Sequence, residues 1–131
     1  MSEGTSSPGT IVWQDLTVPD AAELRGFYGA VAGWTFGEHS MGDYDDYTVH
    51  ASEGGPCVGG LCHARGGNAK IPPAWLIYIE VEDVRASAQA CVDNGGTLID
   101  GPRAMGKQLF FAFRDPAGAV AAIIGPNPDA S

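Results

Sequence analysis

Apolar and polar residues alternate along residues 11–18, a pattern that predicts a β-strand. One face of this strand carries Val12, Leu16 and Val18, and the other carries Trp13, Asp15 and Thr17. A segment with helical spacing follows, in which Asp20 can cap the first turn and Gly33 ends the helix. The apolar stripe of this predicted helix consists of Leu24, Phe27, Tyr28 and Val31.

The second half of the chain repeats this order of elements. Residues 75–81 form the next predicted strand, with Leu76, Tyr78 and Glu80 on one face and Ile77, Ile79 and Val81 on the other. The helix that follows has the apolar stripe Val84, Ala88, Cys91 and Val92. A shift of 63 residues takes Val18 to Val81, Asp20 to Asp83 and Gly33 to Gly96. Such a shift indicates a duplicated supersecondary unit.

Three further strands complete each half of the chain. In the first half, one strand begins at Trp34 and the other two span 47–51 and 57–62. In the second half, the three strands are 97–99, 108–114 and 119–124. The pattern predicts an α+β fold with two βαβββ modules at 11–63 and 74–125, joined by a linker at 64–73. We expect one domain over 11–125, with tails at 1–10 and 126–131. Its curved mixed sheet would have helices on the outer face and a concave cleft.

The charge and composition narrow the choice of partners. The 131 residues carry a formal net charge of −9 and no basic stripe, so nucleic acid and anionic membrane surfaces are not expected as partners. No apolar run is long enough for a membrane span, and the N-terminus lacks the layout of a signal peptide. The three cysteines are an odd number, which favours free thiols and a cytoplasmic location.

Several of these segments together resemble the vicinal oxygen chelate superfamily, which includes glyoxalases, extradiol dioxygenases, fosfomycin-resistance enzymes and bleomycin-binding proteins. The matching pieces are residues 13–20, Phe27-Tyr28, Gly33-Trp34, residues 81–83, residues 94–96 and residues 115–118. They are mainly turn and packing residues, so they indicate the fold and not the chemistry. The closest likeness is to the glyoxalase-like branch of bacteria.

The resemblance also implies where a metal would bind. In metal-using members the ligands come from the first and last strand of each module. Here those positions fall on Trp13 and Leu76, on Gly59 or Gly60, and on Ala122. None of these side chains can bind a metal ion. We therefore expect neither a metal nor another cofactor.

The predicted cleft face carries two carboxylates, Asp15 and Glu80, which are candidates for proton transfer. The alternative, which we favour, is that they lie solvated at the rim or bond to the hydroxyl of Tyr78. The predicted ligand-binding residues are Trp13, Asp15, Tyr47, Leu76, Tyr78, Glu80, Phe111, Phe113 and Ala122. Phe111 and Phe113 alternate with Phe110 and Ala112, so one of these pairs faces the cleft.

Histidines and cysteines offer one more candidate site. A zinc site built from Cys57, Cys62 and His63 is disfavoured, because the two cysteines fall on opposite faces of a strand. His39, His50 and His63 are better interpreted as surface or structural residues.

Two functions remain open at this point. The first is binding of a small apolar or aromatic molecule in the cleft without metal, similar to the bleomycin-binding branch. The second is a glyoxalase-like lyase or isomerase that uses Asp15 or Glu80 for proton transfer. A homodimer is expected, because the edges of a two-module sheet can pair with a second copy.

Overall fold

A computed structural model of the chain describes residues 7–130. In this part of the chain lie two α-helices, eight strands and a short 3-10 helix. Their bounds are β1 (Ile11–Val18), α1 (Ala21–Ala32), β2 (Thr35–Ser40), β3 (Asp45–His50), β4 (Cys57–His63), η1 (Gly66–Asn68), β5 (Trp75–Glu80), α2 (Val84–Asp93), β6 (Thr97–Met105), β7 (Gln108–Arg114) and β8 (Val120–Pro126).

The strands hydrogen-bond in the order β2-β3-β4-β1-β5-β8-β7-β6, a mixed arrangement with two helices. This order confirms the predicted α+β class. The duplication is also visible in the structure, since α1 begins at Ala21 and α2 begins at Val84, 63 residues later. Among residues 7–130, no helix is both long enough and apolar enough to cross a membrane.

The chain divides into two compact units. The first unit is Gln14–Trp75. The second unit combines Leu76 and the residues after it with the start of the chain up to Trp13. The boundary therefore falls inside β1, so residues 11–13 belong with the second repeat and not with the first.

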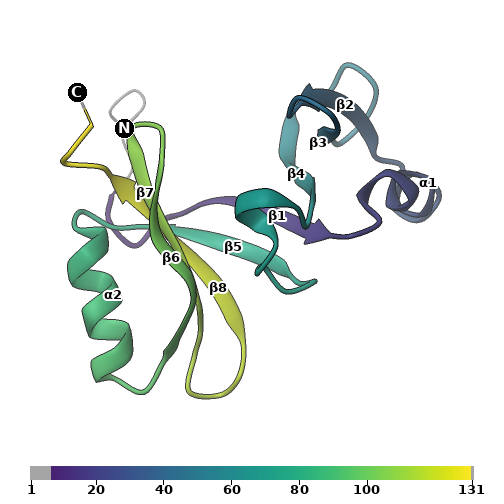
Figure 1. Cartoon of the computed structure of the whole chain (residues 1–131). Coiled ribbons are helices and arrows are strands. Elements are labelled where there is room, and N and C mark those ends of the chain that lie inside the picture. The colour runs from purple at the N-terminus through teal and green to yellow at the C-terminus, as the bar shows by residue number, and fades with distance from the viewer. Residues whose placement is uncertain (1–6, 131) are drawn as a thin grey trace. The chain divides into compact units, whose positions relative to one another are not determined.

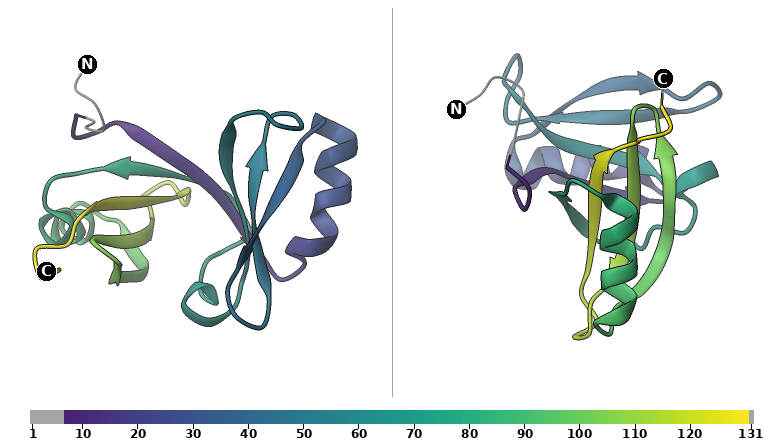
Figure 2. Two further views of the ribbon diagram at one scale, coloured as in Figure 1. Left: turned by 90° about the horizontal axis from the view of Figure 1, so that it is seen from above. Right: turned by 90° about the vertical axis from the view of Figure 1, so that its left-hand side faces the viewer.

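The first unit has the strand order β2-β3-β4-β1, with β1 and β4 parallel and the other pairs antiparallel. Helix α1 packs along one face of these strands (Figure 2). The buried residues between helix and sheet are Leu16, Val18, Ala21, Tyr47, Val49 and Leu61. The alternation predicted for β1 is confirmed, since Leu16 and Val18 both point into this core.

Helix α1 ends as its sequence predicts but packs on a narrower stripe. Gly33 has a left-handed conformation, with φ of 71°, and its N–H donates to the carbonyl of Gly29. Phe27 and Val31 belong to the predicted apolar stripe but are 56% and 67% exposed, so they do not pack in the core. The side chain of Asp20 makes no capping hydrogen bond, which also differs from the expectation.

The second unit has the order β5-β8-β7-β6, with β5 and β8 parallel. Helix α2 lies along β6, β7 and β8 (Figure 1). The core between them consists of Val84, Ala88, Leu109, Phe111 and Ile123. Val92 is 50% exposed and lies outside this core, contrary to the predicted stripe.

In the second unit, hydrogen bonds hold the start of α2 and the end of β5. The carboxylate of Asp83 accepts a hydrogen bond of 3.0 Å from the N–H of Ala86, which confirms the predicted start of α2. At the end of β5, the backbone of Glu80 hydrogen-bonds to Gly9 and Thr10 at 2.6 and 2.9 Å. The segment before β1 thereby extends the sheet of this unit.

Candidate functional site

Each unit has one sheet face that its own helix does not cover, which we call the helix-free face. On the second unit, strand register identifies the residues of this face. Tyr78 lies opposite Ala122, and Ala122 lies opposite Ala112. Residues directly opposite one another on neighbouring strands share a face. Since Phe111 and Ile123 belong to the α2 core, Tyr78, Ala112 and Ala122 face the other way.

An aromatic pair occupies the helix-free face of the second unit. The rings of Tyr78 and Phe110 lie 5.6 Å apart between centroids at an angle of 34°, and both residues are buried. The guanidinium of Arg103 lies 4.9 Å from the centroid of Phe110. The same side chain donates a hydrogen bond of 2.9 Å to the carboxylate of Asp100. This face is therefore apolar and carries one ion pair, between Arg103 and Asp100.

Glu80 lies on this face as well, two residues after Tyr78 and opposite Ile124 in the register. Its Oε1 is buried and has no hydrogen-bond partner among residues 7–130. A buried carboxylate oxygen without a donor is costly, so such an atom points to a missing partner. Of the residues predicted to bind a ligand, Leu76, Tyr78, Glu80 and Ala122 lie on one face.

The predicted placement of Phe111 and Phe113 is wrong. Both side chains pack on the α2 side of the sheet. Their position follows from register, because Ala112, and not Phe111, pairs with Ala122. A shift of one residue along a strand moves a side chain to the opposite face. Sequence reasoning therefore missed Phe110, which takes the position beside Tyr78, and it also missed Arg103.

The helix-free face of the first unit has a different chemical character. Asp15 lies opposite Gly60, which lies opposite Thr48, and Thr17 lies opposite Cys62. Asp15, Thr17 and Asp46 are buried. This face is therefore polar, whereas the corresponding face of the second unit is mainly apolar.

The thiol of Cys62 lies within this polar group. Burial raises its pKa to about 12, and the negative charges of Asp15 and Asp46 act in the same direction. A hydrogen bond with Thr17 lowers the pKa by a smaller amount. Cys62 is consequently a neutral thiol at physiological pH and a poor nucleophile.

Two of the histidines are held by neighbouring groups. The backbone N–H of His63 donates to Oδ1 of Asp46 at 2.8 Å, and its Nδ1 lies 3.5 Å from the same oxygen. The ring nitrogens of His50 lie 2.9 Å from Oγ1 of Thr48 and 3.0 Å from the carbonyl of Gly55. These contacts favour the structural interpretation of both residues.

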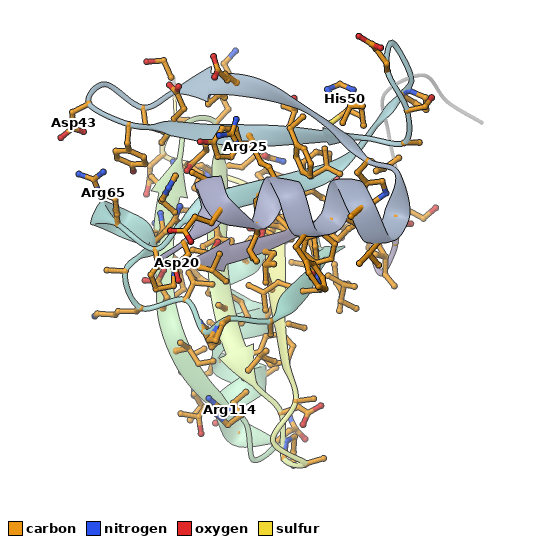
Figure 3. All side chains as sticks on the ribbon, turned by 90° about the vertical axis from the view of Figure 1, so that its right-hand side faces the viewer. Asp20, Arg25, Asp43, His50, Arg65 and Arg114 are labelled. Atoms are coloured by element: carbon orange, nitrogen blue, oxygen red, sulfur yellow. The ribbon has the colours of Figure 1, made fainter. Side chains whose placement is uncertain are left out.

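Nearby, an ion pair closes the loop between β2 and β3 onto the end of β4. The guanidinium of Arg65 lies 3.4 Å from the carboxylate of Asp43 (Figure 3). It also lies 4.1 Å from the centroid of the Tyr44 ring, and that ring meets His63 edge-on at 5.5 Å. The pair is solvent-exposed, so its contribution to stability is small.

Tyr47 was also predicted to contact a ligand, and its placement is wrong. It is part of the α1 core, opposite Leu61 in the register. The guanidinium of Arg25, on α1, lies 4.5 Å from the centroid of the Tyr47 ring. Figure 3 shows Arg25 on this helix. The error is again one of strand parity.

The donor groups do not fit a metal of the kind that the resemblance implies. Trp13, Leu76 and Ala122 offer no oxygen, sulfur or imidazole donor, and neither does a glycine at 59 or 60. Among the described residues, no group of three or more His, Cys, Asp or Glu side chains could hold a metal ion. Cys57 is exposed, and its thiol donates to the carbonyl of Gly59 at 3.6 Å.

A family model described as the Glyoxalase/Bleomycin resistance protein/Dioxygenase superfamily matches residues 10–123. The chain belongs to this superfamily. The match includes both repeats and both helix-free faces.

Two curated proteins are similar to most of this chain. The candidate glyoxylase CFP32 of Mycobacterium tuberculosis is 29% identical over 121 residues, covering 92% of this chain and 45% of that protein. The anthracycline biosynthesis protein DauV of a Streptomyces species is 28% identical over 122 residues, covering 90% of this chain and 42% of its own length. The chain thus spans less than half the length of these relatives.

Solved structures of methylmalonyl-CoA epimerases share the fold. The enzyme of Mycobacterium tuberculosis has a TM-score of 0.54 and 16% identity, covering 95% of this chain and 93% of that chain. A variant of the Streptomyces coelicolor enzyme, in complex with 2-nitronate-propionyl-CoA, has a TM-score of 0.52 and 18% identity, covering 92% and 99%. At these identities the likeness concerns the fold alone.

Proposed function

We propose that this superfamily member binds a small, mainly apolar or aromatic molecule on the helix-free face of its second unit, without a metal ion. The observation that carries the proposal is the buried Oε1 of Glu80, which has no donor within residues 7–130 and lies on the same face as the Tyr78–Phe110 pair. A flat molecule with a hydroxyl or N–H group would stack on the rings and donate to Glu80.

The donor chemistry favours recognition without a metal. Trp13, Leu76 and Ala122 occupy, in this unit, the positions at which metal-using members are expected to hold ligands, and none of these side chains can coordinate a metal ion. The relative named for anthracycline biosynthesis supports a planar aromatic ligand. Hydroxylated anthraquinones are therefore suitable first probes.

A thermal-shift screen with hydroxylated anthraquinones tests the proposal. A ligand present at about 100 times its dissociation constant should stabilise the folded protein by about 2.7 kcal/mol. Phe110→Leu removes one of the two aromatic rings, so it should raise the dissociation constant of each compound that binds by about ten-fold or more. Trp13→Ala examines the remaining predicted ligand residue of this unit in the same assay.

The same strand provides a matched control in Phe111→Leu. Phe110 and Phe111 are both fully buried neighbours on β7, so the two substitutions should cost similar stability. Only Phe111 points to α2. If the hits weaken in Phe111→Leu and not in Phe110→Leu, or if no probe binds, the proposed ligand site is wrong.

A second candidate function is proton transfer, with Glu80 as the general base. It is favoured by the same orphan oxygen, because a base needs an acceptor free of competing donors. The candidate glyoxylase among the relatives supports this class of chemistry. Asp15 remains the other candidate base, and it lies buried in the first unit.

Glu80→Gln separates the two functions, because it keeps the shape of the side chain and removes the base. For a catalyst, this variant should retain binding of a substrate and lose turnover. For a binding protein, it should lower affinity only, because the neutral amide oxygen of glutamine is a weaker hydrogen-bond acceptor than a carboxylate oxygen. Asp15→Asn examines the other candidate base in the same way. Turnover unchanged in both variants would exclude these carboxylates as bases.

A further inference from the structure

A pocket lies in the second unit on the side opposite its helix-free face. It is about 290 Å³ in volume and lies between α2 and the strands β7 and β8. Ser87, Ala90 and Cys91 of α2 form one wall, and the aromatic rings of Phe111 and Phe113 form another. The pocket shares no lining residue with the face assigned above to the proposed ligand.

The pocket exists because α2 is held at its start by the buried Val84 and presents small residues after its first turn. Val84 is buried against Leu109, Phe111 and Ile123, and Ala88 belongs to the same core. The residues of α2 that line the pocket beyond this point are Ser87, Ala90 and Cys91, whose side chains are too short to fill the space.

The internal repeat shows that these small side chains are a specific feature of the second unit. At a shift of 63 residues, Ser87 corresponds to Leu24, Ala90 to Phe27, Cys91 to Tyr28 and Asn94 to Val31. In the first unit, Tyr28 fills its position by stacking on Trp34 at 5.2 Å and meeting Trp75 edge-on at 5.6 Å. The second unit has a small or polar residue at every one of these four positions.

We infer that this pocket is a second binding site of the protein, and that it takes a neutral aromatic molecule of one or two rings. The volume is about twice that of an engineered cavity of about 150 Å³ that holds benzene, so a bicyclic ring system fits. The walls formed by Phe111, Phe113 and Ile123 suit a flat apolar molecule.

The polar groups of the pocket disfavour an anionic ligand. The carboxylate of Asp115 already accepts from the N–H groups of Ala117 and Ala119, at 2.8 and 3.0 Å. The amide of Asn94 donates to the carbonyl of Ala90 at 2.7 Å. A carboxylate at the wall of a protein with net charge −9 repels anions, and the pocket has no cationic lining residue.

Titration of the isotopically labelled chain with indole, followed by amide NMR shifts, tests this inference. Indole is neutral and has two fused rings. We expect shifts concentrated on α2 and β7, including the residues around Cys91. Ser87→Leu restores the residue of the first repeat, and it should raise the dissociation constant by about ten-fold or more because it fills the pocket.

Ala86→Leu is the matched control, since Ala86 is exposed on the same helix and does not line the pocket. It should leave the dissociation constant unchanged. Ala90→Phe, the second filling variant, introduces the other repeat's residue at an exposed position and keeps the test available if Ser87→Leu does not fold. Absence of binding, or equal weakening by Ala86→Leu and the filling variants, overturns the inference. Weakening by Phe110→Leu alone would place indole on the helix-free face instead.

Discussion

The indole N–H of Trp75 donates a hydrogen bond of 3.0 Å to the hydroxyl of Tyr28. This bond joins the last residue of the first unit to α1, in an aromatic cluster that also contains Trp34. At the corresponding position of α2, the second unit has Cys91, which lines an open pocket.

Loss of this hydrogen bond should be measurable by urea unfolding. Tyr28→Phe removes the acceptor and keeps the ring, so we expect a loss of about 1 kcal/mol in the free energy of unfolding. A double-mutant cycle with Trp75→Phe isolates the interaction. If the effects of the two substitutions simply add, the hydrogen bond does not contribute.

The two helix starts should respond differently to the same substitution. Asp83→Ala removes a side-chain cap from α2, and we expect it to cost about 1 kcal/mol. Asp20→Ala removes no capping hydrogen bond from α1, so its cost should be a few tenths of a kcal/mol at most. Urea unfolding of both variants checks this difference, and equal losses would contradict it.

The three thiols should react at very different rates. Cys57 is exposed and should be alkylated by iodoacetamide at pH 8 far faster than Cys62, whose pKa is about 12. Cys91 should also be slow, because burial raises its pKa. Peptide mapping by mass spectrometry over time gives the order, with Cys57→Ser identifying the fast site. Rapid labelling of Cys62 in the folded protein would be inconsistent with its position.

The same thiol should make stability depend on alkaline pH. The pKa of Cys62 is raised from 9.0 in the unfolded chain to about 12 in the folded one, so its contribution is fully present below pH 9. As pH rises from 9 towards 12, the unfolded thiol ionises first, and stability falls by about 1.4 kcal/mol per pH unit. Other groups titrate in this range. The test therefore compares the free energy of unfolding of the wild type with that of Cys62→Ala at pH 8 and at pH 10.5. Between these two pH values the wild type should lose stability relative to the variant.

Two glycines should give opposite results when replaced by alanine. At Gly125 an added Cβ would collide with the carbonyl of Val81 and meet Cγ2 of Val84 at 2.9 Å, so Gly125→Ala should destabilise by about 1–3 kcal/mol. At Gly26, inside α1, nothing lies within 4 Å of the same atom. Gly26→Ala should stabilise by about 0.5–1 kcal/mol because alanine favours the helix. Thermal unfolding of both variants decides between these outcomes.

The sequence was sufficient for the fold because the signals of this duplication are local. The helix stop at Gly33 and the cap at Asp83 depend on a few neighbouring residues, and the shift between repeats brings them into register. The widths of the apolar stripes were less predictable. Phe27 and Val31 have the helical spacing of core residues, yet both are exposed, since spacing does not reveal which neighbours are present.

The candidate site was less predictable, because a β-strand shows which residues alternate but not which set faces the helix. Phe110 and Phe111 are adjacent and equally apolar, so β7 could be assigned to either face. The pairing of Ala112 with Ala122 decides the matter, and that pairing joins strands whose register the sequence does not show. The errors at Phe111, Phe113 and Tyr47 all have this cause.

The boundary inside β1 has a consequence for dividing the protein. A cut in the 64–73 segment would separate the chain at its most irregular stretch, yet it would not release two self-sufficient pieces. The upstream fragment would carry away Gly9 and Thr10, which hydrogen-bond to Glu80 of the second unit. Fragment complementation would therefore require strand donation from one piece to the other. A rearranged gene that encodes the second unit as an independent domain must supply that strand again.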